Sequence, residues 1–277
     1  MAVLLFWNIG RRESGAAIGH LCREYDVDVL LLAEAEIGSA SLTTAINEVT
    51  GSSRTFWELP PREGRVRAFT RYSPGDVEPT FDDNHIKMLD LHPLTGVPLL
   101  IVAAHLPSKL WGDNNNQAYW VRTLRQDIMR EETKLGHQNT VIIGDLNLNP
   151  FEDALTAADG LQGVMDRQVA TRPARVVQGS KWDYFYNPMW SRLGDASPGP
   201  PGTYWRAGSD LVNHFWNTFD QVLLRPALLP FYQPEQLRVP DHVDGQPILH
   251  VGGTAGDLSD HLPVVIELSI EMEMGRG

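Results

Sequence analysis

Residues 144 to 147 read Gly-Asp-Leu-Asn and follow a short apolar run, residues 141 to 143. Alternate side chains of a strand point to the same face, so Asp145 and Asn147 would face one ligand together. Gly, Asp and Asn are also common turn residues, and Pro150 would end the strand shortly afterwards. This stretch alone leaves both a plain turn and a catalytic strand end open.

Polar side chains recur at or just beyond the ends of several apolar runs. They are Asn8, Glu34, His105, Asp145, Asn147, Asp220, Asp260 and His261. Each one alone has an ordinary structural explanation as a turn residue, a helix or loop cap, or a buried histidine with its hydrogen bonds satisfied. Strand ends gathered at one edge of a sheet, however, are where active sites form. The set therefore predicts one site at a sheet edge.

These residue types suit one kind of chemistry. Carboxylate and amide oxygens are hard ligands, which favour Mg²⁺, with Mn²⁺ as a second choice, over zinc. A histidine whose tautomer is fixed by a nearby aspartate can bind phosphate and transfer protons. A hard cation beside such groups fits hydrolysis of a phosphate ester by in-line attack of water.

Composition narrows the possible classes of protein. The 277 residues are enough for one large domain or two small ones, and 42% hydrophobic with 21% charged residues is ordinary for a globular protein. The net charge of −12 argues against a broad electrostatic grip on nucleic acid, but it permits an enzyme that contacts a few phosphates. A single cysteine, Cys22, excludes a disulfide framework and a cysteine metal cage.

The N-terminus and the hydropathy pattern bear on location. No apolar segment approaches the length of a membrane span. The first ten residues, MAVLLFWNIG, lack the basic region and the small-residue cleavage site of a signal peptide. We expect a cytoplasmic protein with no membrane association and no stable protein partner.

The elements that must position these residues follow from the apolar patterns. Strands are expected over residues 3–8, 27–34, 65–72, 84–92, 98–106, 140–147, 216–224 and 262–272. Helices are expected over residues 14–25, 39–49 and 115–134, with a shorter one over 149–158. Ser14 is the expected N-cap of the first helix. The continuous apolar run from 27 to 34 is typical of a strand covered on both faces, which favours two packed sheets flanked by helices.

Residues 165 to 217 have a different composition, rich in Gly, Pro and aromatic residues. This composition predicts a long loop insertion. Its aromatic residues, such as Trp205 and Trp216, could stack on the bases of a nucleic acid. The alternative, that they pack the loop against the body of the domain, is the commoner role of such residues.

Six motifs in order resemble the endonuclease/exonuclease/phosphatase superfamily, which includes deoxyribonuclease I, exonuclease III-type nucleases, sphingomyelinases and inositol polyphosphate 5-phosphatases. The motifs are FWNIG, DVLLLAE, AAHLPS, GDLNLNP, FDQVL and SDHLPV. They span nearly the whole chain. The resemblance implies an α/β fold, a four-layer α/β/β/α sandwich of two packed mixed β-sheets flanked by helices, in a single catalytic domain over residues 1–277.

The resemblance also implies a metal site. Glu34 would be the principal Mg²⁺ ligand, with Asn8 beside it and Asp260 completing or adjoining the site. The family usually has Gln before this Glu, and here the residue is Ala33, so one supporting hydrogen bond is expected to be missing. Glu36 is close enough in sequence to leave open which of the two glutamates binds the metal.

The remaining residues take catalytic roles by the same resemblance. Asp145 would orient or deprotonate the attacking water, and Asn147 would hold a phosphate oxygen or position Asp145. His261, oriented by Asp220, would contact the scissile phosphate and transfer a proton. His105 would bind phosphate or help the leaving group, as in the deoxyribonuclease I and sphingomyelinase branches. One departure is Gln221, next to Asp220, where many members carry Tyr or His.

The preferred substrate is nucleic acid, cleaved as a phosphodiester. Lys109, Arg122 and Arg125 are candidates for phosphate contacts because they follow the HLPSK block, although a solvated helix face explains them equally well. A phosphomonoesterase or a lipid-head-group phosphodiesterase on the same site remains the alternative. A non-catalytic binding protein would be expected to carry lesions in the set, whereas Glu34, Asp145, Asp260 and His261 are all present.

Overall fold

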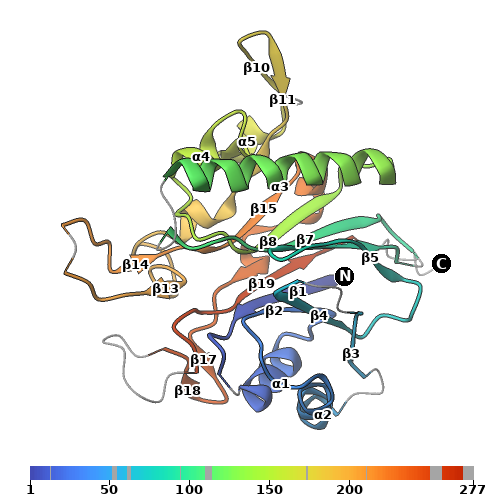
Figure 1. The fold of residues 1–277 in the computed structure, drawn as a ribbon. Helices are drawn as coiled ribbons and strands as arrows, with labels where there is room; N and C mark the ends of the chain where they lie inside the picture. Colours follow the sequence, from blue (N-terminus) through green and yellow to red (C-terminus); the bar gives the residue numbers. More distant parts are fainter. Residues whose placement is uncertain are drawn as a thin grey trace.

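The structure is a computed structural model that describes residues 1–12, 14–51, 55–60, 64–93, 95–109, 114–172, 174–209, 211–249 and 258–270 (Figure 1). Two large β-sheets lie face to face and helices cover their outer faces. The expected four-layer α/β/β/α sandwich is therefore confirmed.

The first sheet contains both ends of the described chain. Its strand order is β16-β19-β1-β2-β4-β3, and only β1 and β2 run parallel within it. The strands are β1 (Ala2–Asn8), β2 (Val29–Ala33), β3 (Trp57–Glu58), β4 (Val66–Thr70), β16 (Leu237–Arg238) and β19 (Val264–Leu268).

The second sheet is formed mainly by the middle of the chain, in the order β5-β6-β7-β8-β15-β12-β9. Parallel pairing joins β7 to β8 and β12 to β9, and the other pairs are antiparallel. The strands are β5 (Val77–Asp82), β6 (Ile86–Leu91), β7 (Leu99–His105), β8 (Thr140–Asp145), β9 (Gly163–Val164), β12 (Phe185–Tyr186) and β15 (Asp220–Leu224).

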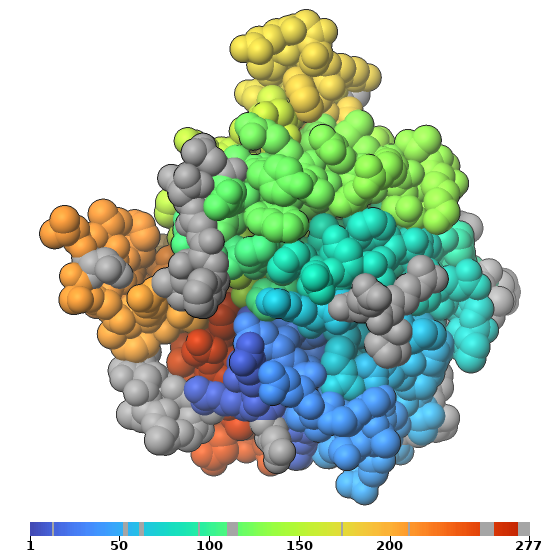
Figure 2. All heavy atoms as spheres, viewed as in Figure 1, coloured from blue at the N-terminus to red at the C-terminus, as the bar shows by residue number. Residues whose placement is uncertain are grey.

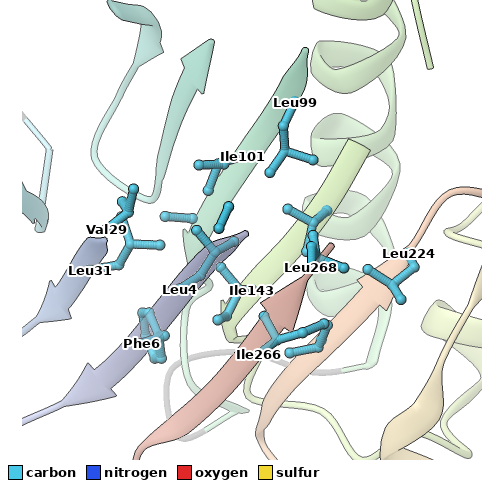
Figure 3. Packing of buried hydrophobic residues seen from close by; sticks show 14 of the residues in the cluster. Leu4, Phe6, Val29, Leu31, Leu99, Ile101, Ile143, Leu224, Ile266 and Leu268 are labelled. Atoms are coloured by element: carbon cyan, nitrogen blue, oxygen red, sulfur yellow. The ribbon is translucent and has the colours of Figure 1, made fainter. Parts of the chain in front are cut away.

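The main core lies between the two sheets. Leu4 and Phe6 of β1 are buried in one cluster with Ile101 of β7 and Ile143 of β8 (Figure 3). The intervening side chains of β1 face the other way, and Trp7 packs in the cluster beneath the helices. Because both faces of β1 are covered, its sequence is apolar throughout, as expected for such strands.

The two outer layers are helical. Helices α1 (Gly15–Glu24) and α2 (Ser39–Thr50) cover the first sheet, and the long helix α3 (Asn114–Leu135) covers the second (Figure 1). Val121, Leu124 and Ile128 of α3 pack on the outer face of β7 and β8. Among helices in the described ranges, none combines the length and apolar composition needed to cross a membrane. The cytoplasmic location stays a prediction.

Several local expectations differ from the structure. Ser14 does occupy the N-cap position of α1, but it makes no cap bond, and its hydroxyl donates to the carbonyl of Leu258 instead. The expected helix over residues 149–158 is a single turn, α4 (Asp153–Thr156). The expected strand over residues 216–224 is divided into β14 (Trp216–Asn217) and β15. The last part of the expected C-terminal strand lies outside the described residues.

The Gly/Pro/aromatic-rich stretch contains short elements where a plain loop was expected. One hairpin, β10 (Arg175–Val177) with β11 (Ser180–Trp182), projects from the body, and a second one pairs β13 (Tyr204–Trp205) with β14 (Figure 1). Strand β12 joins the second large sheet. The stretch also contains α5 (Arg167–Ala170) and the 3-10 helix η2 (Pro188–Arg192). Later in the chain lie the 3-10 helices η3 (Pro226–Phe231) and η4 (Pro234–Gln236) and the short strands β17 (His242–Val243) and β18 (Gln246–Pro247).

Candidate active site

Strand register brings three of the predicted residues into one row. In the parallel pair β7–β8, His105 lies opposite Asp145, and in the antiparallel pair β8–β15, Asp145 lies opposite Asp220. Gly144 allows the tight fit of β8 against β7, since a Cβ there would lie 2.0 Å from the carbonyl oxygen of Ala104. The second sheet thus places a histidine and two aspartates side by side at one edge.

The first sheet contributes Asn8 and Glu34 from two adjacent parallel strands. Asn8 is the last residue of β1 and pairs with Ala33, so Glu34 follows directly beside it. Glu34 has a φ of +53°, a left-handed conformation that is uncommon for a non-glycine residue. Asn8 Nδ2 donates to Asp145 Oδ2 over 3.1 Å, and this hydrogen bond links the two sheets at the site.

Hydrogen bonds fix both the ring and the backbone of His261. Its Nδ1 and Asp220 Oδ2 are 2.8 Å apart, and its Nε2 lies 3.8 Å from Asp145 Oδ2. The Ser259 hydroxyl accepts from the backbone N–H of His261 and donates to the carbonyl of Asn8, while Trp7 Nε1 donates to the carbonyl of His261. The ring therefore has one fixed orientation, with Nε2 toward Asp145.

Charge sets the protonation of this ring. Burial alone would lower the pKa of His261, but the carboxylates of Asp220, Asp145 and Asp260 outweigh burial and raise it to about 10. In the metal-free protein His261 is therefore an imidazolium at neutral pH, and its Nε2–H can donate to an anion.

Asn147 combines the two interpretations that the sequence left open. It has a φ of +51°, its backbone N–H donates to Asp145 Oδ1 over 2.9 Å, and its Nδ2 donates to the carbonyl of Leu106 over 2.8 Å. These are turn interactions. The same turn places Asp145 and Asn147 at one cavity wall, so turn chemistry and site formation coincide.

His105 lies between the two acidic groups. Its Nε2 is 3.5 Å from Glu34 Oε1 and 3.9 Å from Asp145 Oδ2. His85 Nδ1 lies 3.0 Å from the carbonyl oxygen of His105. Across the described ranges, the buried His105 Nδ1 has no hydrogen-bond partner. The histidine thus presents Nε2 to the cavity.

One cavity of about 700 Å³ collects the predicted residues. Those lining it are Asn8, Glu34, His105, Lys109, Asp145, Asn147, Asp260 and His261. Asp220 is fully buried behind His261. Residues from both sheets and from the loop before β19 therefore meet at one end of the sandwich.

Of the three candidates for phosphate contacts, one lies at the cavity and two lie elsewhere. Lys109 lines the cavity, where its ammonium pairs with Glu152. Arg122, on the exposed face of α3, pairs with Asp159 over 2.7 Å beside a different, small hollow. Arg125 is buried and donates to the carbonyl of Gly160. The structure thus places Arg122 and Arg125 away from this cavity, because the cavity lies beyond the strand ends and not along α3.

The aromatic residues proposed for base stacking also lie elsewhere. Trp205 and Trp216 face each other across the β13–β14 hairpin, and neither lines the cavity. Tyr204 does line it, with its ring centre 4.6 Å from that of His261. Burial, with the carboxylates of Asp260 and Asp145, raises the pKa of Tyr204, so its phenol stays neutral. Apart from its place in an aromatic-rich stretch, nothing in the sequence marks Tyr204.

A second residue that the sequence did not indicate supports Glu34. The guanidinium of Arg67, on β4, donates to the carbonyls of Ala35 and Ile37, in the loop that follows Glu34. Its Nε and Nη2 also bind both carboxylate oxygens of Glu58, at 2.8 and 2.9 Å. Arg67 thus anchors the loop that carries Glu34.

The two glutamates of this loop differ in position. The side chain of Glu36 is 69% exposed, and the residue is not among those lining the cavity. Arg11 Nε lies near both glutamates, 3.3 Å from Glu36 Oε1 and 3.8 Å from Glu34 Oε2. Glu34 is in the cavity and faces His105. Of the two candidates, Glu34 is therefore the one placed to reach a ligand.

The donor atoms fit a hard divalent cation. The ligand atoms of Asp145, Asp220 and His261 all lie within 4.8 Å of one another, close enough for a shared ion. The contact between His261 and Asp220 already engages one side of this group. The carboxylates of Glu34 and Asp260 and the amide of Asn8 add oxygen donors around the same cavity.

The acidic residues and histidines of this cavity fit a hydrolase of phosphate esters. The chain belongs to the Endonuclease/Exonuclease/phosphatase family, whose model matches residues 5–261. Members of this family are phosphoric ester hydrolases, and the resemblance seen in the six motifs is confirmed.

Solved structures share the fold at low sequence identity. An endonuclease/exonuclease/phosphatase family protein from Leptotrichia buccalis C-1013-b is 10% identical over 97% of this chain and 99% of its own, with a TM-score of 0.57. An AP endonuclease from Archaeoglobus fulgidus is 12% identical over 98% and 100%, with a TM-score of 0.55. A 3′ phosphatase from Neisseria, bound to product DNA hairpin, is 14% identical over 97% and 99%, with a TM-score of 0.54. Among curated proteins, none matches this sequence.

Proposed function

We propose that this protein is a Mg²⁺-dependent phosphodiesterase that cleaves nucleic acid by attack of water on phosphorus. The observation that carries the proposal is the environment of Asp145 Oδ2. Asn8 Nδ2 lies 3.1 Å from it, His261 Nε2 3.8 Å and His105 Nε2 3.9 Å, all in one cavity. A carboxylate beside two histidines can bring a base and hydrogen-bond donors to the same phosphate.

Glu34, Asn8 and Asp260 are the residues proposed to hold the metal ion, with Mg²⁺ as the natural occupant and Mn²⁺ as a substitute. Their donors are oxygens, which suits these hard ions. When bound, the ion neutralises negative charge on the phosphoryl oxygens. Arg67 and the left-handed backbone of Glu34 hold the loop in the position that points this carboxylate into the cavity.

In the proposed reaction, Asp145 orients a water molecule and accepts its proton as the new P–O bond forms. Asn147 holds a phosphate oxygen or keeps Asp145 in position. His261, fixed by Asp220, donates a hydrogen bond to the phosphate. As the bond to the leaving oxygen breaks, the Nε2–H of His105 hydrogen-bonds to that oxygen, which takes up a proton from solvent, and Asp145 later returns its own proton to solvent. Each role requires the side chain to reach the same phosphate, and all but the supporting Asp220 line one cavity.

Two considerations support nucleic acid as the substrate. Lys109 gives the cavity a cationic side chain, although Glu152 pairs with it. Two of the structures with this fold are named for DNA-directed activities, the AP endonuclease and the 3′ phosphatase bound to product DNA hairpin. With a net charge of −12, binding would depend on local contacts at the cavity and not on a broad basic surface.

The test compares the wild-type protein with Asp145→Ala on supercoiled plasmid, single-stranded oligonucleotides and bis-p-nitrophenyl phosphate, each with Mg²⁺ and with EDTA. Metal-dependent cleavage of a nucleic acid by the wild type alone is the expected result. Cleavage of the small diester only, or release of inorganic phosphate from monoesters with nucleic acid intact, would replace the nuclease proposal with a phosphatase or lipid-head-group phosphodiesterase. No hydrolysis of any ester would favour a binding role.

A further inference from the structure

The cavity extends well past the catalytic residues. Its volume of about 700 Å³ is in the range of pockets that enclose a whole small molecule, and is more than a phosphate group alone requires. Beyond Asn147 its wall continues through Phe151 and across to His214, on the loop between β13 and β14. This hairpin stands at one side of the molecule (Figures 1 and 2), and its Tyr204 contacts the ring of His261.

Phe151 is an exposed aromatic residue on a fixed backbone. It follows Asn149, whose Nδ2 donates to Asn217 Oδ1 over 3.0 Å and whose Oδ1 accepts from the backbone N–H of Thr218 over 2.9 Å. The Glu152 carboxylate accepts from the backbone N–H of Asn149. These bonds tie the segment around Phe151 to the start of β15 and hence to Asp220. The position of the ring relative to the catalytic row is therefore set by the fold.

The ring itself is available. Phe151 is 45% exposed and contacts His214 edge-on, with ring centres 5.9 Å apart and planes at 77°. The exposed part of the phenyl ring is open to contact with another planar group. Phe215, on the same loop as His214, is similarly exposed at 52% but does not line the cavity.

We propose that Phe151 and His214 form a subsite for an unpaired nucleobase of the substrate, the base of the nucleotide whose phosphate is held at His261. The inference rests on the proposed function and specifies its substrate as single-stranded or frayed nucleic acid. A base paired in a duplex is already stacked on its neighbours, so only an unpaired base can use the Phe151 face. Stacking also supplies affinity that a protein of net charge −12 does not gain from phosphate contacts.

The kinetic test uses two diesters with one leaving group, thymidine 5′-(4-nitrophenyl phosphate) and methyl 4-nitrophenyl phosphate. Because base–aromatic stacking is worth about 1–3 kcal/mol, Phe151→Ala is expected to raise KM for the thymidine ester about tenfold. The kcat for this ester and the kcat/KM for the methyl ester should stay within about twofold. Phe151→Trp should restore the lower KM, and Phe215→Ala, the matched control, should behave as the wild type.

Three kinetic outcomes would overturn the subsite. An equal loss on both esters would place Phe151 in structure or catalysis. An unchanged KM for the thymidine ester would show that the base is not bound there. A loss in Phe215→Ala as large as in Phe151→Ala would assign the effect to the loop in general.

A binding measurement separates the subsite from the hydrolytic activity. Calorimetry with Mg²⁺ compares thymidine 5′- and 3′-monophosphate with methyl phosphate, and the two nucleotides present the base from opposite sides of the phosphate. If the wild type cleaves neither diester, the proposed function fails. The subsite still stands if Phe151→Ala weakens binding of at least one nucleotide about tenfold and leaves methyl phosphate unchanged. Equal affinities in wild type and variant for both nucleotides would overturn it.

Discussion

The catalytic row of the cavity and the opposite end of the β-sandwich differ in how their carboxylates are paired. At the end away from the cavity, acidic side chains meet arginines. Asp28 and Asp26 pair with Arg71, and Glu132 binds the guanidinium of Arg225 at 2.8 and 2.9 Å. At the cavity end, among the described residues, the cationic partners of Asp145 and Asp220 are histidines, and no lysine or arginine pairs with either carboxylate.

This difference indicates that the end with the arginine–carboxylate pairs serves stability and that the cavity end serves activity. Buried carboxylates next to arginine are neutralised within the protein and have no need of a ligand. Carboxylates crowded together at the cavity keep an excess of negative charge, and such a site gains from a bound cation. The strands run from one end to the other, since β8 begins at Thr140, which bonds to Glu132, and ends at Asp145. Stability and activity should therefore respond to different substitutions.

The largest effect is expected at the cavity end. Asp145→Ala should lower kcat with bis-p-nitrophenyl phosphate about 10²–10⁴-fold, the usual contribution of a positioned base. The unfolding temperature of the metal-free protein should stay the same or rise, because one of several crowded acidic groups is removed. Initial rates and thermal denaturation measure the two effects. A variant with kcat within tenfold of the wild type would remove Asp145 from the proposed mechanism.

At the end away from the cavity, a substitution is expected to lower stability and leave activity unchanged. Glu132→Gln leaves the buried guanidinium of Arg225 without its carboxylate, and should lower the free energy of unfolding by about 3–5 kcal/mol. The kcat of the folded fraction should be unchanged. Urea unfolding and rates measured well below the transition check this. The double variant Glu132→Leu with Arg225→Met is the control and should be less destabilised than Glu132→Gln, since it leaves no unpaired buried charge.

Much of the fold and most of the site were predictable, because both depend on local pattern. Most of the longer strands, such as β1, β2, β7 and β8, were visible as apolar runs, and the polar residues that end them, such as His105 and Asp145, lie in one cavity with Asn8 and His261. Parallel and antiparallel register does the rest, since it aligns strand ends that are far apart in sequence.

The features that could not be predicted are contacts between segments that are far apart in the sequence. Arg67 supports the loop after Glu34 from a strand 33 residues later, and Tyr204 reaches His261 from a hairpin in the aromatic-rich stretch. Arg122 looked like a phosphate contact because it follows the HLPSK block, but the direction of α3 points it to Asp159. Ser14 is of a residue type that often caps helices, but its hydroxyl donates a hydrogen bond to the carbonyl of Leu258 instead.

A finer comparison of the two ends uses two arginines on β4 and the segment just after it. Arg67 holds the loop after Glu34, and Arg71 holds the turn before β2 through Asp26 and Asp28. Both are anchored by a carboxylate and donate to backbone carbonyls, so Arg71→Gln is a matched control for Arg67→Gln. If Glu34 binds the metal, Arg67→Gln should weaken Mg²⁺ binding about 10–100-fold, as loss of a supporting group typically does.

Calorimetric titration with Mg²⁺ measures the affinity, and the Mg²⁺ concentration for half-maximal rate gives a second reading. Arg71→Gln should bind Mg²⁺ as the wild type does, although both variants lose stability. Equal Mg²⁺ affinity in the two variants would mean that Arg67 is only structural, or that Glu34 is not a ligand.

The smallest effect concerns acid stability at the end away from the cavity. Burial lowers the pKa of His137 below its ordinary 6.5, and Asn139 N–H donates to its Nδ1. As the pH falls from 7 to 5, the unfolded chain takes up this proton first, so the contribution of His137 to stability is complete above pH 6.5 and declines through the window below it. His137→Gln, which stays neutral, should show a shallower fall in the urea midpoint between pH 7 and 5 than the wild type. Parallel curves for the two proteins would mean that His137 titrates alike in the folded and unfolded chains.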